Sequence, residues 1–387
     1  MTTISPGGEA ADPAAARPPG PPPGQGGRRA SVRPIERLTD LAIAAFLWAF
    51  RIVVLLVVVV GSIATLASGK YSLETWVDLI ENGLTLGSIY ALIALGYTMV
   101  YGILRMINFA HGDIFAGGAF AGYFVAVALA GAGLLNANPV ASLLSVGLMI
   151  VVAMAASTLM AVGLERVAYR PLRNAPRLVP LISAIGASFF LEYTYRGLFG
   201  PGIYAYPDVA VLGEAVPVPI LNMQWVDVLV IVSALLMMTV LYLFVMRTRL
   251  GTSIRAVSED RDAAALMGID ANRAIVLTFA VGAAMAGAAG VLYGLKFTQV
   301  YFYTGFYPGI KAFTAAVLGG IGNIPGAMLG GLFLGLIESV GPTLFLDGLN
   351  VPSPNQLKDV IGFTMLVLVL VFRPSGILGE RIARGRA

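Results

Sequence analysis

The sequence predicts an all-α polytopic membrane protein, and three observations lead to this fold class. First, 58% of the 387 residues are hydrophobic and only 12% carry a charged side chain, whereas soluble domains average about 25% charged residues. Second, the apolar residues occur in long runs, and one helix needs about 20 such residues to cross a bilayer. Third, the arginines outside these runs cluster as they do in loops on one side of a membrane.

Ten apolar segments give about 8–10 transmembrane helices, including one short or broken helix. The segments are 42–67, 76–104, 107–131, 140–164, 179–199, 225–246, 274–295, 309–322, 326–345 and 357–372. The eighth, 309–322, is too short to cross a bilayer with ease. The residues at its end and just after it that favour a break are Gly319, Gly320, Gly322, Pro325 and Gly326. They predict a hinge or a partly re-entrant helix, which is tolerated where protein or water surrounds the backbone.

The ends of the chain differ in composition from its apolar middle. Residues 1–37 are rich in Pro, Ala, Gly and Arg, so this segment has little to bury and is predicted to be a disordered cytoplasmic arm. Residues 38–70 are predicted to form an extra N-terminal membrane helix, and residues 71–380 the main transmembrane domain with a polar cytoplasmic loop at 247–273. A basic cytoplasmic tail, 381–387, is expected at the end.

The distribution of positive charge predicts which loops face the cytoplasm. Arginines cluster before the first segment, after the fourth and sixth segments, and at the end of the chain. With ten crossings all four clusters lie on one side, which the positive-inside rule assigns to the cytoplasm. The loop 200–224 on the other side contains Asp208 and Glu214 but no Lys or Arg. Both termini are therefore predicted to be cytoplasmic.

Several function classes are excluded by residues that the chain lacks. It has no cysteine and one histidine, His111, so a zinc site with three or four protein ligands is not expected. We predict no catalytic residue, because an intramembrane hydrolase needs a nucleophile–base pair or a metal. The single Gly-Lys pair, Gly69-Lys70, does not fit a phosphate-binding loop, so no cofactor is expected. A net charge of +4 is too small to indicate nucleic-acid binding.

The loop 247–273 is the most informative polar segment, with nine charges among its 27 residues. Thr252 or Ser253 is expected to cap one helix and Ser258 a second, shorter one, because a hydroxyl can accept free N–H groups of a first turn. Gly268 is expected to end the second helix. The residues predicted to form this second helix and to contact a partner are Glu259, Asp260, Ala263, Ala264, Leu266 and Gly268. Such a helix can dock into a partner's groove; the alternative is an ordinary solvated loop.

Polar side chains inside the apolar segments are candidates for a translocation pathway, because such groups are costly in a bilayer and usually face the protein interior. The candidates are Thr85, Ser88, Tyr97, Thr98 and Asn108. The alternative is that this helix, with Gly83 and Gly87, uses small residues for close packing. Glu192 and Glu338 are expected to meet an arginine or a helix end, and Lys311 to extend to the membrane interface.

Six stretches of the chain resemble permease subunits of branched-chain amino-acid ABC importers. The first stretch, 82–102, NGLTLGSIYALIALGYTMVYG, continues to the second, 106–113, MINFAHGD; the others are 165–173, 259–278, 311–326 and 374–379. The resemblance covers residues from about 73 to 380, and its motifs stand in the family's order. The first membrane segment and the proline-rich arm are not part of the family's usual short form.

This resemblance implies an ABC-importer permease architecture in a bacterial inner membrane. The implied partners are cytoplasmic ATPase subunits that hydrolyse ATP, a periplasmic solute-binding protein, and a second permease subunit that makes a heterodimer or a homodimer in the lipid bilayer. The implied function is inward movement of branched-chain or related amino acids, with urea and short amides as other cargoes. Residues 259–268 correspond to the family's coupling helix, which sits on the ATPase.

The alternative function is a self-sufficient secondary transporter or channel for small polar solutes. It would need a relay of several intramembrane carboxylates, and the sequence offers only Glu192 and Glu338 as candidates.

Overall fold

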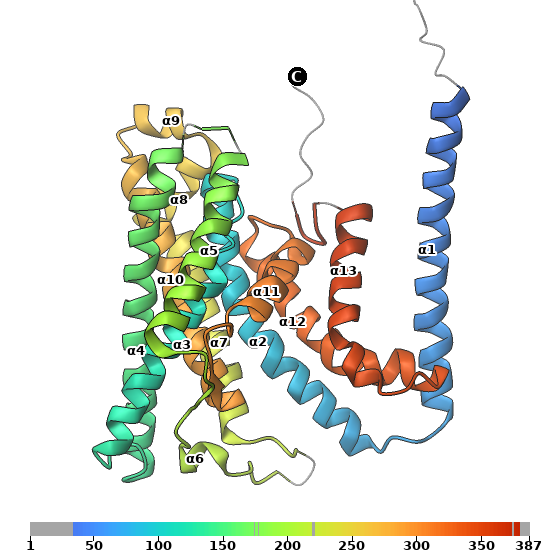
Figure 1. Ribbon diagram of the computed structural model, residues 1–387, viewed down its shortest axis with the longest axis horizontal. Helices are drawn as coiled ribbons and strands as arrows, with labels where there is room; N and C mark the ends of the chain where they lie inside the picture. Colours follow the sequence, from blue (N-terminus) through green and yellow to red (C-terminus); the bar gives the residue numbers. More distant parts are fainter. Residues whose placement is uncertain (1–33, 174, 177, 219–220, 374, 380–387) are drawn as a thin grey trace, which may run out of the picture. The chain divides into compact units, whose positions relative to one another are not determined.

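The computed structural model describes residues 34–173, 175–176, 178–218, 221–373 and 375–379 (Figure 1). The chain divides into two compact units, residues 1–55 and 56–387, and each is described by itself. Most of the expected N-terminal arm and the expected basic tail, 381–387, lie outside the described residues.

The first unit contains most of helix α1, which runs from Pro34 to Ala67 and continues into the second unit. The helix begins inside the range expected to be an arm, because the fixed φ of proline suits a first helical turn. No residue of the apolar stretch with the highest hydropathy in Leu41–Ala67 is buried. An apolar helix exposed all around suits lipid as its surroundings.

The second unit is a bundle of long helices. These are α2 (Leu73–Leu104), α3 (His111–Gly131), α4 (Pro139–Leu164), α5 (Leu178–Phe199), α7 (Trp225–Arg247), α10 (Ala271–Phe297), α11 (Phe306–Gly319), α12 (Ile324–Gly341) and α13 (Lys358–Phe372). Helix α4 continues through π and 3₁₀ turns to Leu172, and α12 likewise to Leu349. The shorter elements are α6 (Ala210–Gly213), α8 (Arg249–Glu259), α9 (Arg261–Leu266), a 3₁₀ turn (Pro354–Leu357), and strands β1 (Tyr204–Ala205) and β2 (Gln299–Val300), which pair antiparallel.

Nine helices of the described residues are long and apolar enough to cross a membrane. This confirms the predicted all-α polytopic fold. Helix α11, with 14 residues, is not one of them, so the predicted short helix is present. It begins at Phe306, three residues earlier than expected, and ends at Gly319.

The centre of the bundle is formed by α2 and α10, the two helices with the most deeply buried apolar stretches. Helix α2 packs along α12, α10, α11 and α7. In Figure 1, α8 and α9 lie at one end of this unit and α6 at the other.

Glycines allow α2 and α12 to approach backbone to backbone. A Cβ atom on Gly335 of α12 would lie 2.2 Å from the amide nitrogen of Gly87 on α2, and one on Gly83 would lie 2.9 Å from the Cα of Leu336. Membrane helices use small residues in this way because lipid gives them no hydrophobic drive to associate. The packing interpretation is therefore correct for Gly83 and Gly87.

The last turns of α1, within the second unit, pack on the segment that follows α12. A Cβ on Gly61 would lie 1.9 Å from the carbonyl oxygen of Phe345, and the amide of Gly348 donates to Thr65 Oγ1 at 2.8 Å. Just beyond the helix, Lys70 Nζ lies 2.9 Å from Asp347 Oδ2. The hydrogen bond to this carboxylate raises the pKa of Lys70 above its ordinary value.

Candidate functional site

The polar loop between α7 and α10 forms two helices, α8 and α9, but their caps are not the expected ones. Thr248 caps α8, its Oγ1 accepting from the amide of Gly251 at 3.0 Å. Asp260 caps α9, and one of its oxygens accepts from the amides of Asp262 and Ala263 at 2.9 Å each. Ser258 instead donates to the carbonyl of Arg255 inside α8. A carboxylate is the better partner for a helix start because it also complements the dipole.

The end of α9 agrees with the sequence prediction. Gly268 has φ +81°, a left-handed conformation that favours glycine. Its amide donates to the carbonyl of Ala265, and the amide of Ile269 donates to that of Ala264. These bonds satisfy the last carbonyls of the helix as in a Schellman-type stop. The chain therefore turns back sharply into α10 and leaves α9 as a short projecting helix.

The two faces of α9 differ in exposure. Leu266 and Met267 are 90% and 82% exposed, and the capping side of Glu259 and Asp260 is also exposed. Ala264, however, is buried and belongs to the main hydrophobic core. Of the residues assigned to docking, Ala264 therefore holds α9 to the bundle, whereas Leu266 and its neighbour Met267 are free to contact a partner.

An arginine in place of Ala264 is expected to damage folding and not only docking. The substitution would put a charge into a core position, which costs several kcal/mol unless the charge finds a partner. We expect at least a severalfold loss of monodisperse protein in detergent size-exclusion chromatography. Ala263→Arg, at an exposed neighbouring position, is the matched control and should elute normally. Equal yields of the two variants would contradict the assigned burial.

Helix α8 connects α9 to the end of α2. Ile254 and Val257 of α8 are buried in the main core, and Arg105 Nη2 donates to the carbonyl of Ser258 at 3.3 Å. Arg105 itself ends α2 with φ 54°, an unusual conformation for a residue other than glycine. The α8–α9 pair is therefore in direct contact with the start of the turn between α2 and α3.

The turn between α2 and α3 holds Asn108, one of the pathway candidates. Asn108 is buried, and its side-chain oxygen accepts from the Tyr169 hydroxyl at 2.6 Å. Its side-chain nitrogen has no hydrogen-bond partner among the described residues. Asn108 therefore ties the turn to the end of α4 while keeping one donor unused.

Three further pathway candidates are buried hydroxyl residues of α2. Thr85, Ser88 and Thr98 are each at most 1% exposed, and their hydroxyl oxygens have no hydrogen-bond partner among the described residues. An unsatisfied buried hydroxyl costs about 1–3 kcal/mol. Their burial agrees with either a pathway that is closed in this conformation or ordinary helix packing, and both interpretations remain.

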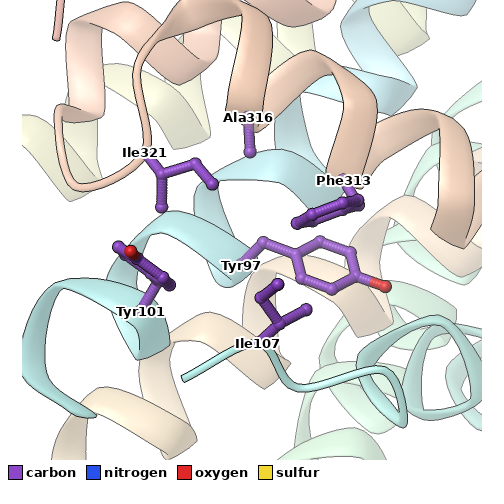
Figure 2. Close-up of a pocket in the computed structure, with 6 residues that line it drawn as sticks. All are labelled: Tyr97, Tyr101, Ile107, Phe313, Ala316 and Ile321. Carbon is purple, nitrogen blue, oxygen red and sulfur yellow. The ribbon is translucent and has the colours of Figure 1, made fainter. Parts of the chain in front are cut away.

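Tyr97, the last pathway candidate, borders a small apolar pocket. Figure 2 shows it with Tyr101 of α2, Ile107 of the following turn, Phe313 of α11, and Ile321 of the turn after α11. The pocket has a volume of about 10 Å³, which is room for about one water molecule. The pocket as observed is too small to hold an amino acid. It lies where the turn between α2 and α3 meets the turn between α11 and α12.

The glycine-rich segment expected to be a hinge forms the turn between α11 and α12. Gly320 and Gly322 have φ +111° and +96°, and a Cβ on Gly319 would lie 1.9 Å from the carbonyl of Gly326. Pro325 stands in the first turn of α12, where its missing N–H costs nothing. These residues thus make a tight helical hairpin, and hinge motion there stays a prediction.

The C-terminal motif covers the end of the short helix. The amides of Ile377 and Leu378 donate to the carbonyls of Leu318 and Gly319 at 2.8 and 3.0 Å. The side chain of Asn323 in turn donates to the Leu378 carbonyl at 2.9 Å. The last carbonyls of a helix otherwise lack partners, so this segment stabilises a helix end within the bundle.

An ion-pair cluster with two buried members, Lys311 and Glu338, and one partly exposed member, Asp359, joins α11, α12 and α13. Lys311 Nζ lies 2.5 Å from Glu338 Oε1 and 2.7 Å from Asp359 Oδ1, and the Tyr90 hydroxyl lies 3.4 Å from the same glutamate oxygen. The expectation that Lys311 extends to the interface is wrong, because it is 8% exposed and ion-paired. Glu338 meets this lysine, not an arginine or a helix end.

Sequence reasoning missed Asp359 as a member of this cluster. Its only sequence signal was a carboxylate in the first turn of a predicted membrane segment, a position that the helix dipole alone explains. It likewise missed Asp227 of α7, which pairs with Lys296 of α10 at 2.6 Å. When the two residues of an ion pair lie on helices far apart in the chain, the sequence around each residue does not indicate its partner.

The first turn of α3 holds His111 and Asp113, which are both buried. His111 packs against Gly96, where a Cβ would lie 2.1 Å from its Nε2, and makes an edge contact with Tyr97. Ser188 donates to the Asp113 carboxylate. No ion pair of the described residues involves Glu192, and these residues contain no group of three potential metal ligands.

Membrane-length helices around a short helix, together with a projecting helix at one end, define a multi-pass membrane protein of the transport-permease class. The family described as the permease component of branched-chain amino acid transport systems matches residues 79–370. The chain belongs to this family. Helix α1 lies outside the matched range.

Individual relatives match nearly their whole length. The high-affinity branched-chain amino acid transport permease BraD of Pseudomonas aeruginosa is 46% identical over 319 residues, which is 79% of this chain and 96% of the relative. The permease LivH of Escherichia coli K12 is 44% identical, over 77% of this chain and 94% of the relative. The probable permease LivH of Methanocaldococcus jannaschii is 28% identical, over 78% of this chain and 92% of the relative. No solved structure matches the chain.

Proposed function

We propose that the chain is the membrane-spanning subunit of an ATP-driven importer that moves branched-chain or related amino acids into the cell. The family and its relatives, which are named for branched-chain amino acid transport, support this cargo. The observation that carries the proposal is α9, a capped helix that projects from one end of the bundle with Leu266 and Met267 exposed.

The proposed partners follow from what this chain offers to them. An exposed pair of large apolar side chains on a short helix suits a groove in another protein, and we assign that groove to cytoplasmic ATPase subunits. A solute-binding protein delivers the amino acid at the opposite end, where α6 and the loop 200–218 lie (Figure 1). A second permease, either a copy of this chain or a related one, completes the pathway.

The proposed orientation places α8 and α9 in the cytoplasm of a bacterium, with the chain in the inner membrane. Two contacts support it, because they bring arginine-rich segments to one end. Arg105 bonds the carbonyl of Ser258 at 3.3 Å, and Arg173 bonds Asn272 at 2.6 Å. The loops before α5 and before α10 therefore lie on the same side, and positively charged loops favour the cytoplasm. Both termini are proposed to lie on that side.

Uptake by reconstituted vesicles tests the function. The chain is placed in proteoliposomes with the ATPase, permease and binding-protein subunits that co-purify with it, and uptake of labelled leucine is measured with and without ATP. We expect uptake that requires ATP and is inhibited by unlabelled isoleucine and valine but not by urea. Uptake by the chain alone without ATP would contradict the proposal and favour a self-sufficient transporter.

A further inference from the structure

The cluster of Lys311, Glu338 and Asp359 carries an unbalanced charge. One ammonium faces two carboxylates, at 2.5 and 2.7 Å. Among the ion pairs of the described residues, Lys311 is the only cation that meets either carboxylate. With Lys and both acids ionised, the cluster therefore holds one net negative charge.

Structural stability alone does not account for this arrangement. A buried ion pair recovers the cost of leaving water only when its geometry is good and its remaining lone pairs are hydrogen-bonded. Here the second oxygen of Glu338, Oε2, is buried and has no hydrogen-bond partner among the described residues. Glu338 itself is 3% exposed. A further cationic donor beside this oxygen would satisfy both the free lone pairs and the excess charge.

The cluster also extends from a partly exposed side chain into the bundle. The side chain of Asp359 is 41% exposed, whereas those of Lys311 and Glu338 are 10% and 2% exposed. Lys311 lies in the second turn of α11, a helix of 14 residues and hence about 21 Å long, against a bilayer core of about 30 Å. Interrupted helices of this kind hold the substrate-contacting groups of many transporters.

We propose that Lys311, Glu338 and Asp359 form a contact site for the zwitterionic head of an amino acid. The substrate ammonium bonds the two carboxylates, including the free oxygen of Glu338, and the substrate carboxylate bonds Lys311 Nζ. When the substrate binds, each charged side chain of the cluster loses its internal partner and gains a charged group of the substrate. No charge is therefore left unpaired. This inference rests on the proposed importer function and adds the chemistry by which the pathway recognises its cargo.

Asp359→Asn tests the site, because it removes the excess charge and leaves the Lys311–Glu338 pair. The complete complex is reconstituted, and labelled leucine uptake, ATP hydrolysis and thermal unfolding are measured on the same preparation. We expect leucine moved per ATP hydrolysed to fall at least about tenfold, the loss expected when one charge-assisted hydrogen bond is removed. Binding-protein-stimulated ATPase activity and the melting temperature should stay near those of the wild type.

The matched control is Asp347→Asn, which neutralises another lysine-paired carboxylate, 2.9 Å from Lys70, outside the cluster. It should leave leucine moved per ATP unchanged. Normal transport by Asp359→Asn overturns the proposal, and so does an equal loss of transport and ATPase activity, which would indicate a structural latch between α11 and α13.

A second variant covers the case in which Asp359→Asn fails to assemble. Asp359→Glu keeps the charge on a longer arm, so the ion pair to Lys311 can still form while the substrate position shifts. A lower ratio of leucine to ATP supports the site, and an unchanged ratio overturns it. If the wild-type complex carries only an uncharged amide or urea, the zwitterion site fails although the importer function stands. If it carries another amino acid, the variants are measured with that one.

Discussion

Replacing Leu266 and Met267 together with aspartate is expected to abolish ATP-driven uptake while leaving the membrane bundle folded. Both side chains are exposed in the chain alone, so no core contact is lost. Burying two such side chains in a partner contributes about 3–6 kcal/mol, and each 1.4 kcal/mol is about a factor of ten in affinity. We expect the ATPase subunits to bind at least about a hundredfold more weakly, measured by co-purification at graded ATPase concentrations.

The control for this variant is Leu250→Asp. Leu250 is also an exposed apolar residue of the same polar loop, but it lies in the first turn of α8, where an acid complements the helix dipole. It should bind the ATPase subunits as the wild type does. Equal weakening by both variants would mean that charge in the loop matters in general, and normal uptake by the Leu266/Met267 variant would refute α9 as the docking helix.

The membrane helices were predictable from the sequence because their signal is local. Lipid demands about 20 apolar residues in succession, and no packing partner can hide or create such a run. The apolar segment 225–246 is thus observed as α7, Trp225–Arg247, and 179–199 as α5, Leu178–Phe199. The short helix was also predicted, since too few apolar residues precede the glycines at 319–326.

The candidate site was less predictable, because its features depend on residues far apart in the chain. Ala264 looks like its neighbours in composition, and only the fold of α8 and α9 against α10 makes it a core residue. Lys311 and its carboxylates are separated by 27 residues in one pair and stand on three helices. The predicted helix caps were wrong because several hydroxyl and carboxylate side chains lie close together at each helix start. Any of them can accept the free amides of a first turn, and the structure uses Thr248 and Asp260 where the sequence suggested nearby hydroxyl residues.

The role of Gly83 and Gly87 also could not be decided from the sequence alone. The sequence marks Gly83 and Gly87 as small residues on a polar stripe, which suits a pathway wall as well as a helix contact. Only the position of α12 decides between them: a Cβ on Gly87 would lie 2.8 Å from the Cα of Leu332. Gly83 and Gly87 are therefore packing residues, while the role of Thr85 and Ser88 beside them stays a prediction.

Replacing Gly335 with alanine is expected to destabilise the bundle more than its single added methyl group suggests. The new Cβ would lie 2.2 Å from the nitrogen and 2.3 Å from the Cα of Gly87, and 2.5 Å from the Gly83 carbonyl oxygen. Backbone atoms cannot move aside as a flexible side chain does, so α2 and α12 must separate. Overpacking of this kind costs about 1–3 kcal/mol, and we expect a lower melting temperature of the purified chain in detergent.

Gly147→Ala is the matched control, because it adds the same methyl group to another long membrane helix, α4, where a Cβ would meet nothing within 4 Å. Alanine is the better helix former by about 1 kcal/mol, so this variant should melt at or above the wild-type temperature. The two substitutions thus have opposite expected signs although their chemistry is identical. A Gly335→Ala chain that melts with the control would mean that α2 and α12 are not in backbone contact, and the short α11 would then lack the rigid pair against which it packs.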